Sequence, residues 1–334
     1  MNKTIVTTIT CAFLTLNSCM GQKNNKIMDK KEKSELGCDL ETGICEVKGG
    51  TPSSSSSQQV AQAFNKPVKI IYFTDPICSS CWGIEPQLKL LKLHYGAQVE
   101  IEYRMGGLLP GWDNYNGGGI QSPADVAVHW EEAGKYYEMP IDGDVWKENP
   151  LSSSFPPSIA FKAAELQDKE KALLFMRKMR EMVFMEKKNI AEWSEIEAAA
   201  KAVQLDITQL KKDYNDTAKS LFEEDLKLSR NMGVRGFPTL IFVNDQQESL
   251  RLYGSRPFQD FEQVLHTLYP AINKEKFDPE AAVLFKMFGT LTTKEFASLS
   301  NLSIQKALPL LKELEQQGKI RKKDSKNGPL WIAK

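Results

Sequence analysis

Residues 68–81 read VKIIYFTDPICSSC, and this stretch decides the fold class of the 334-residue chain. Its first six residues are mostly β-branched or aromatic and predict a strand, whereas the apolar periodicity that continues to Leu93 predicts a helix. Cys78 and Cys81 therefore fall where a strand gives way to a helix. The first sulfur is expected at the helix N-terminus, where free amides and the helix dipole favour the thiolate. The second lies on the same helix face and is placed to attack a mixed disulfide.

A Cys-x-x-Cys pair has three interpretations: thiol–disulfide chemistry, half of a zinc site, or two unreactive thiols. Zinc sites usually need two more Cys or His ligands at similar spacing, and His94, His129 and His266 stand isolated in the sequence. Redox chemistry is therefore favoured, and neither a metal nor a cofactor is expected. His129 falls on an amphipathic stretch and is expected to pack or to face solvent rather than to act in catalysis.

A second motif, GVRGFPT at residues 233–239, precedes another strand-like run, Leu240–Val243. Proline is confined to the start or edge of a strand because it has no N–H to donate. Together with the Cys-x-x-Cys pair and Pro86, which follows it, this motif resembles the thioredoxin superfamily. The resemblance implies a cis peptide bond at Pro238, beside the cysteines, and a backbone at Phe237 that is offered to a substrate peptide.

The segment between the two motifs, about residues 107–232, is predominantly helical and too long for thioredoxin itself. It resembles the insertion of the DsbA family. Two shorter motifs, Asp75-Pro76 and GGLLP at residues 106–110, resemble the FrnE-like and SpxH (YjbH)-like branches of that family. The resemblance covers residues 66–270 and implies that Cys78 is the nucleophile and Cys81 the resolving thiol.

The chain departs from the family pattern at two points. Tyr72 occupies the position, six residues before the first cysteine, where the family carries a buried acid, and the Cys-x-x-Cys interior is Ser-Ser. Asp75, Glu85 and Glu102 are the nearby acids, and each is expected to be a solvated or capping charge. The redox potential and the direction of the chemistry stay open.

The composition is that of an ordinary globular protein, with 41% hydrophobic residues and with 43 basic residues balanced by 43 acidic ones. No stretch reaches the ~20 apolar residues that a membrane helix needs. Residues 1–19 resemble a bacterial lipoprotein signal, with a short apolar run and a lipobox that ends at Cys19. This predicts a lipid on Cys19, as the only membrane contact, and a place in the cell envelope. The alternative is a cytoplasmic protein that starts at Met28.

Residues 20–65 predict a flexible tether, because their Lys, Asp, Glu, Gly and Ser content cannot bury a core. Cys38 and Cys45 lie within it, with six residues between them. They are expected to form a structural or auxiliary redox disulfide, able to exchange with Cys78 and Cys81, or else to be two independent thiols.

Residues 270–278 predict a hinge, and residues 279–334 resemble a winged helix. Basic residues crowd the predicted wing between Lys319 and Lys326 and favour contact with phosphates. Pro309, inside the would-be recognition helix, and the absence of arginine from that helix both oppose the reading of bases. Protein contact or structural support is therefore expected of this domain, and DNA is not the expected partner.

These residues together predict an α/β protein: a thioredoxin-like fold with a large helical insertion, followed by a winged-helix-like domain. The favoured function is a thiol–disulfide oxidoreductase acting on protein cysteines, with protein thiol or disulfide substrates and a redox partner of unknown identity. The alternative is a non-enzymatic SpxH-like adaptor that binds a protein partner for proteolysis. The glutathione-dependent isomerases of the family generally lack the second cysteine, so Cys81 argues against that class.

Overall fold

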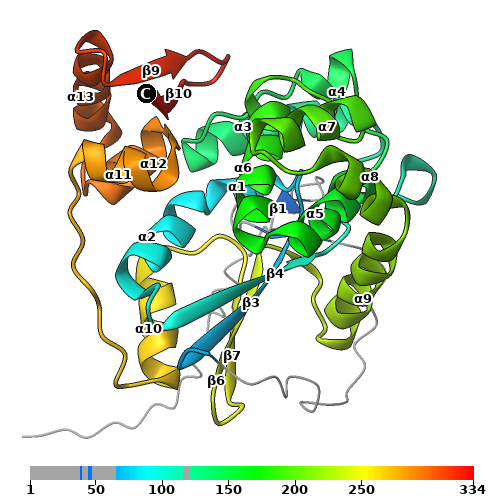
Figure 1. Ribbon diagram of the computed structural model, residues 1–334, viewed down its shortest axis with the longest axis horizontal. Coiled ribbons are helices and arrows are strands. Elements are labelled where there is room, and N and C mark those ends of the chain that lie inside the picture. Colours follow the sequence, from blue (N-terminus) through cyan, green and yellow to red (C-terminus); the bar gives the residue numbers. More distant parts are fainter. Residues whose placement is uncertain (1–37, 40–43, 47–64, 116–119) are drawn as a thin grey trace, which may run out of the picture. The chain divides into compact units, whose positions relative to one another are not determined.

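The computed structural model describes residues 38–39, 44–46, 65–115 and 120–334, and for the first two of these segments only the backbone. Figure 1 shows a twisted sheet with helices packed on it, followed by a further group of helices and short strands that ends at the C-terminus. Within the described ranges, no helix has both the length and the apolar character needed to cross a bilayer.

The central sheet has the strand order β4-β3-β6-β7. Strand β3 (Val68–Thr74) pairs in parallel with β4 (Val99–Met105) and antiparallel with β6 (Thr239–Asn244). The sheet ends at β7 (Ser249–Tyr253), which forms a hairpin with β6. The strands predicted over residues 68–73 and 240–243 correspond to β3 and β6.

Alternate residues of β3 face two different cores, because successive side chains of a strand point to opposite faces. Ile71 and Phe73 pack into the core shared with the helical insertion. Ile70 and Tyr72 pack on the other face, against the helices Glu85–Tyr95 and Phe258–Leu268. Burial on both faces explains why the strand reads as a continuous hydrophobic run rather than as an alternating one.

The crossover between β3 and β4 consists of two helices, α1 (Ser79–Gly83) and α2 (Glu85–Tyr95). The apolar periodicity predicted one helix, but the backbone breaks at Ile84, which ends α1 and caps α2. Pro86 lies in the first turn of α2, where its missing N–H would have no helical partner in any case.

The insertion forms a helical layer over the other face of the sheet (Figure 1), and it confirms the predicted thioredoxin-like fold with a large helical insertion. The methionines of its longest helix lie in the core, since Met176, Met179 and Met182 are at most 3% exposed. The elements of this layer are η1 (Trp112–Asn114), α3 (Pro123–Tyr137), α4 (Val145–Glu148), α5 (Phe155–Gln167), α6 (Lys169–Met185), α7 (Trp193–Ala202), α8 (Ile207–Asn215) and α9 (Thr217–Asn231).

A small second sheet forms where the sequence predicted a tether. Its order is β1-β2-β5, with β1 (Cys38–Asp39), β2 (Ile44–Glu46) and β5 (Gly236–Phe237) all antiparallel. In its register Cys38 lies opposite Cys45, and Cys45 in turn lies opposite Phe237. Part of the predicted tether is therefore paired with the strand that precedes Pro238.

The chain beyond β7 continues through α10 and then builds a three-stranded antiparallel sheet, in the order β8-β10-β9, with three helices around it. The elements are α10 (Phe258–Leu268), α11 (Ala281–Phe288), β8 (Thr290–Thr292), α12 (Thr293–Leu299), α13 (Ile304–Gln316), β9 (Ile320–Lys323) and β10 (Leu330–Ala333). Assignment of this C-terminal domain to the winged-helix class stays a prediction.

The segment predicted as a hinge is not free, because it is hydrogen-bonded to the end of α2. The Glu275 N–H donates to the carbonyl of His94 at 2.9 Å, and the Gln98 side chain donates to the carbonyl of Asn273 at 2.7 Å. Leu93 of α2 also joins the apolar core of the C-terminal domain. The domain is therefore docked on α2 rather than suspended from a linker.

Candidate functional site

The two cysteines lie at the start of α1, as the sequence predicts. Cys78 is the residue that caps the helix, and its sulfur accepts a hydrogen bond from the Cys81 N–H at 3.2 Å. Both side chains are 0% exposed, and both are free thiols. The site is thus assembled but enclosed.

The electrostatics of the pair differ from the expectation. Burial, followed by the hydrogen bond with Cys81, raises the pKa of Cys78 well above its usual value. Burial also works against ionisation of Cys81, but the hydrogen bond from Cys78, the charge of Arg180 and the Thr74 hydroxyl outweigh it, and the Cys81 pKa is lowered. The predicted preference for a thiolate at Cys78 is opposed by these two shifts, because Arg180, the cation that favours a thiolate, acts chiefly on Cys81.

Arg180 is a site residue that sequence reasoning missed. It is 1% exposed and donates to Thr74 Oγ1 at 2.7 Å, to Glu85 Oε1 at 2.6 Å and to the Asp75 carbonyl at 3.3 Å. A signal was present, since Arg180 falls four residues after Met176, on the apolar face of α6. A cation at such a position usually has a buried partner.

Arg180 is part of a buried network of ion pairs, which it joins through Glu85. Glu85 also pairs with Lys89 at 3.0 Å, and Lys89 pairs with Glu295 of the C-terminal domain at 2.8 Å. Arg177 donates two hydrogen bonds to Glu295, at 2.6 and 2.9 Å, and its guanidinium lies 4.5 Å from the Trp82 ring. A continuous series of ion pairs therefore links Arg180, beside the thiols, to Glu295 in the C-terminal domain.

Asp75 was expected to be a solvated or capping charge, and it is fully buried. Its carboxylate accepts hydrogen bonds from the N–H groups of Ile77 at 3.1 Å and Leu108 at 2.7 Å, and from the Ser154 hydroxyl at 2.8 Å. Burial raises the pKa of Asp75 to about 6, although these hydrogen bonds lower it. The hydrogen bond from the Leu108 N–H joins the two motifs, because the carboxylate of the Asp75-Pro76 motif accepts from the backbone of the GGLLP motif.

The remaining acids and Tyr72 have structural partners. The Tyr72 hydroxyl accepts a hydrogen bond from Thr74 at 3.1 Å, and burial raises the Tyr72 pKa well above its usual value, so the group is neutral where the family carries an acid. Glu102 pairs with Lys69 and Arg104 on the sheet. Glu102 and Glu85 are thus ion-paired rather than solvated.

The Phe237–Pro238 peptide bond is cis, as predicted. The Phe237 ring is 1% exposed and packs directly over Gly106, where an added Cβ would lie 1.8 Å from the ring. The first glycine of the GGLLP motif therefore leaves the space that the Phe237 ring fills.

The backbone at Gly236–Phe237, which the resemblance assigns to a substrate peptide, pairs with β2 of the same chain. The register that places Cys38 opposite Cys45 fits the predicted disulfide at the level of the backbone, and the positions of their sulfur atoms lie outside the described structure. Cys19 and the predicted lipoprotein signal also lie outside the described residues.

The predicted basic wing is partly neutralised. Lys326 pairs with Glu131 and with Asp144, both at 2.8 Å, and Lys323 pairs with Glu186 at 2.7 Å. These contacts attach the wing to the helical insertion and reduce the charge that remains for phosphates.

Comparison with known proteins gives the family. A family model described as thioredoxin matches residues 72–263. The ClpXP adapter protein SpxH of Halalkalibacterium halodurans is 32% identical over 305 residues, which cover 90% of this chain and 97% of the relative. The chain belongs to the SpxH family of thioredoxin-like proteins. The SpxH adapter of Bacillus subtilis is 31% identical over 80% of this chain and 89% of its own length.

The SpxH relationship corrects the prediction that this chain is a protein-disulfide oxidoreductase, because these relatives are named as adapters and not as enzymes. A solved structure, a putative protein disulfide isomerase from Nitrosomonas europaea, is similar with a TM-score of 0.53. It is 19% identical and covers 60% of this chain and 97% of its own. At that identity it shows the fold alone. The enclosed thiols agree with the correction, since a nucleophilic sulfur must be accessible.

Proposed function

We propose that this SpxH-family chain is an adaptor that binds a protein partner and presents it to the ClpXP protease. The observation that carries the proposal is the length of the match: the similarity to the named ClpXP adapter extends over 97% of that relative. It therefore includes the C-terminal domain as well as the thioredoxin-like part.

Two features of the structure support a binding role over a catalytic one. Cys78 and Cys81 are 0% exposed, and the backbone edge that a substrate peptide would use is paired with β2. The basic wing is attached to acids of the insertion, which favours a structural or protein-contacting role for the C-terminal domain.

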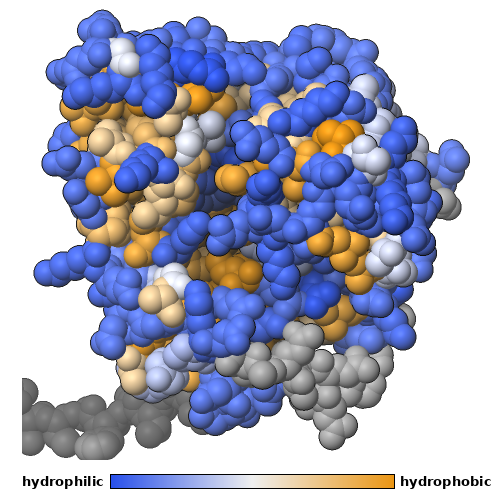
Figure 2. All heavy atoms as spheres, in the orientation of Figure 1, coloured by the Kyte–Doolittle hydropathy of each residue, from blue (hydrophilic) through white to orange (hydrophobic). Residues whose placement is uncertain are grey.

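Exposed apolar side chains offer contact area for a partner. Leu174 and Met287 are 53% and 48% exposed and line a groove between α2, α6 and α11. Figure 2 shows apolar residues gathered over α11 on the face that it displays. Grouped apolar residues of this kind are typical of protein interaction surfaces.

The test is degradation by purified ClpXP. Proteins captured by the full chain are incubated with ClpXP and ATP, with and without the chain, and with a Cys78→Ser/Cys81→Ser double variant. At least one captured protein should be degraded several-fold faster with the chain, and the double variant should retain this effect within about twofold. No acceleration by the wild type, or loss of acceleration in the double variant, would contradict the non-enzymatic adaptor.

The location follows from the same proposal. The adaptor proposal is consistent with the cytoplasmic alternative, in which translation starts at Met28. A lipid on Cys19 would instead place the chain in the envelope. The intact mass of the protein purified from its own host distinguishes the two. A lipid-modified N-terminus at Cys19 would count against the adaptor.

A further inference from the structure

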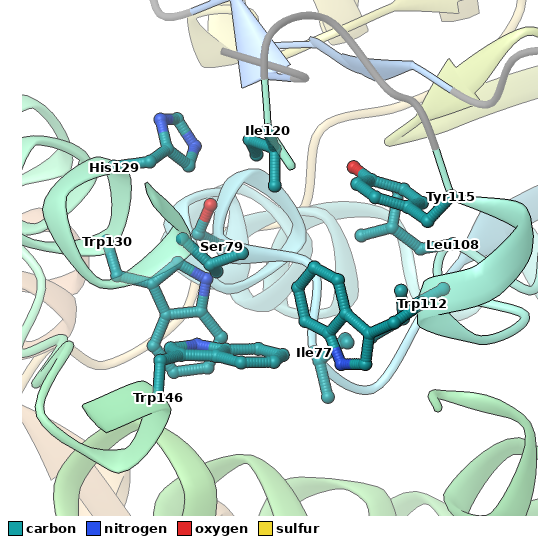
Figure 3. Close-up of a pocket in the computed structure, with 11 residues that line it drawn as sticks. Ile77, Ser79, Leu108, Trp112, Tyr115, Ile120, His129, Trp130 and Trp146 are labelled. Carbon is teal, nitrogen blue, oxygen red and sulfur yellow. The ribbon is translucent and has the colours of Figure 1, made fainter. Parts of the chain in front are cut away.

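A pocket lies beside the start of α1, between this helix and the helical insertion. Its empty volume is about 370 Å³, and its walls come from α1, from the segment around Trp112 and from α3 and α4. Figure 3 shows His129, Trp130 and Trp146 on one side of the hollow, Trp112 and Tyr115 on the other, and the Ser79 hydroxyl between them. Aromatic and aliphatic side chains make up nearly all of the wall.

Polar atoms in this wall have no hydrogen-bond partner among the described residues. They are Nδ1 and Nε2 of His129, Oγ of Ser79 and Nε1 of Trp146. These three side chains are at most 2% exposed. Buried polar groups in native proteins are almost always hydrogen-bonded, so three such side chains around one hollow point to an occupant that supplies the missing bonds.

The pocket is electrically neutral. Burial lowers the pKa of His129 to about 4, and burial together with the charge of Asp75 raises the pKa of Tyr115 to about 12. Both side chains are therefore uncharged at neutral pH, and the described residues that line the pocket include no Lys, Arg, Asp or Glu. A charged ligand would lose its hydration without gaining a partner of opposite charge.

The hydrogen-bonding pattern restricts the occupant further. The indole N–H of Trp146 can only donate, whereas a neutral imidazole offers one donor and one acceptor, and the Ser79 hydroxyl offers both. The occupant must therefore accept at least one hydrogen bond and donate at least one.

The size of the space selects a small group. The space open to the centres of water molecules is about 30 Å³, compared with the ~10–15 Å³ that a single water needs. The aromatic rings of the wall already pack on one another at right angles, since the Trp146 ring lies edge-to-face with Trp130 at 5.3 Å and with Trp112 at 6.0 Å, which leaves room for only a few atoms. A primary carboxamide has this size, and it carries both donors and acceptors.

We propose that this pocket binds a primary carboxamide group. The group belongs either to a small free amide or to the Asn or Gln side chain of a protein partner, and the second source rests on the proposed adaptor function. The amide oxygen accepts from Trp146, and the amide NH₂ donates to the unprotonated nitrogen of His129.

The test is an NMR titration of the full-length protein. The indole N–H resonance of Trp146, identified with the Trp146→Phe variant, is followed as acetamide is added, in parallel with acetate and acetone. Acetamide should shift this resonance saturably, acetate should not, and acetone, which cannot donate, should bind more weakly.

The variant His129→Phe keeps the ring but removes both nitrogens, and it should weaken acetamide binding by about fivefold or more. It should fold normally because those nitrogens have no protein partner, and an unchanged thermal midpoint checks this. His266→Phe, an exposed histidine on α10, is the matched control and should bind acetamide as the wild type does.

Two outcomes would overturn the proposal: no saturable shift with up to 200 mM acetamide, which would mean that water alone fills the hollow, or equal affinity in the wild type and His129→Phe. The source of the amide is decided by N-acetyl-asparagine N-methylamide, in which the side chain carries the only primary carboxamide. Tighter binding than acetamide assigns the pocket to a peptide side chain, and binding that is equal or weaker assigns it to a free amide. Both arms are independent of ClpXP, so failure here is distinguishable from failure of the adaptor proposal.

Discussion

Glu295 is the charge that fastens the C-terminal domain to the thioredoxin-like part, and replacing it with glutamine tests this directly. The carboxylate is 0% exposed, lies 2.8 Å from the Lys89 ammonium, and accepts hydrogen bonds from Arg177 at 2.6 and 2.9 Å. It also accepts from the Thr292 N–H at 2.7 Å and so caps α12. Glutamine keeps the shape but leaves two cations without their shared anion.

The expected loss follows from the pKa of the group. Burial opposes ionisation of Glu295, but Arg177 and Lys89 outweigh it and lower its pKa from 4.5 to about 2. At about 1.4 kcal/mol per pKa unit, neutralising this carboxyl costs roughly 3.5 kcal/mol of unfolding free energy. Removal of one partner from a buried ion pair typically costs about 3–5 kcal/mol, so two routes agree.

The assay is urea unfolding followed by circular dichroism, for the wild type, Glu295→Gln and the exposed control Glu313→Gln. The pKa of Glu295 is depressed in the folded state, so the ionised carboxylate stabilises the fold above pH 4.5, and this stabilisation is lost as the pH falls toward 2. The difference in unfolding free energy between the wild type and Glu295→Gln should therefore be constant from pH 5 to 8 and become smaller below pH 4.5. A loss no larger than that of Glu313→Gln, or a gap that widens as the pH falls, would refute the reasoning.

Two further changes test the surroundings of the thiols. Arg180→Met removes the cation that stabilises the Cys81 thiolate and should raise the Cys81 pKa, seen as a later rise of thiolate absorbance near 240 nm on titration; an unchanged curve would contradict this. Gly106→Ala places a Cβ 1.8 Å from the Phe237 ring and should destabilise the fold by about 1–3 kcal/mol, measured by urea unfolding. Gly111→Ala, where a Cβ meets nothing within 4 Å, should be near neutral, and equal losses in the two alanine variants would refute the packing argument.

Periodicity predicted the insertion well because its helices carry long amphipathic patterns. The segment predicted as helical, about residues 107–232, contains helices such as Lys169–Met185 and Ile207–Asn215. The break at Ile84 was not predicted, because the apolar pattern continues across it without interruption.

The candidate site was predictable only in its local part. Cys78, Cys81 and Pro238 were found because motifs carry them, and the thiols lie at the strand–helix junction as expected. The ionic partners were not found, because Arg177 and Glu295 are 118 residues apart and Arg180 and Glu85 are 95 apart. No short-range pattern predicts such pairings. The enclosure of the thiols was missed for the same reason: the surrounding residues come from distant parts of the chain.

Strand β2 pairs with Gly236–Phe237, the edge that the family resemblance assigns to a peptide strand, so a peptide at that edge would compete with a segment of the same molecule. Because β2 belongs to the same chain, its effective concentration at the edge is set by the connecting segment and does not fall on dilution. A peptide strand would bind only those molecules in which β2 is detached from this edge. Its apparent dissociation constant would equal the intrinsic one divided by the fraction of such molecules. A chain that begins at residue 65 would bind the same peptide without this internal competitor.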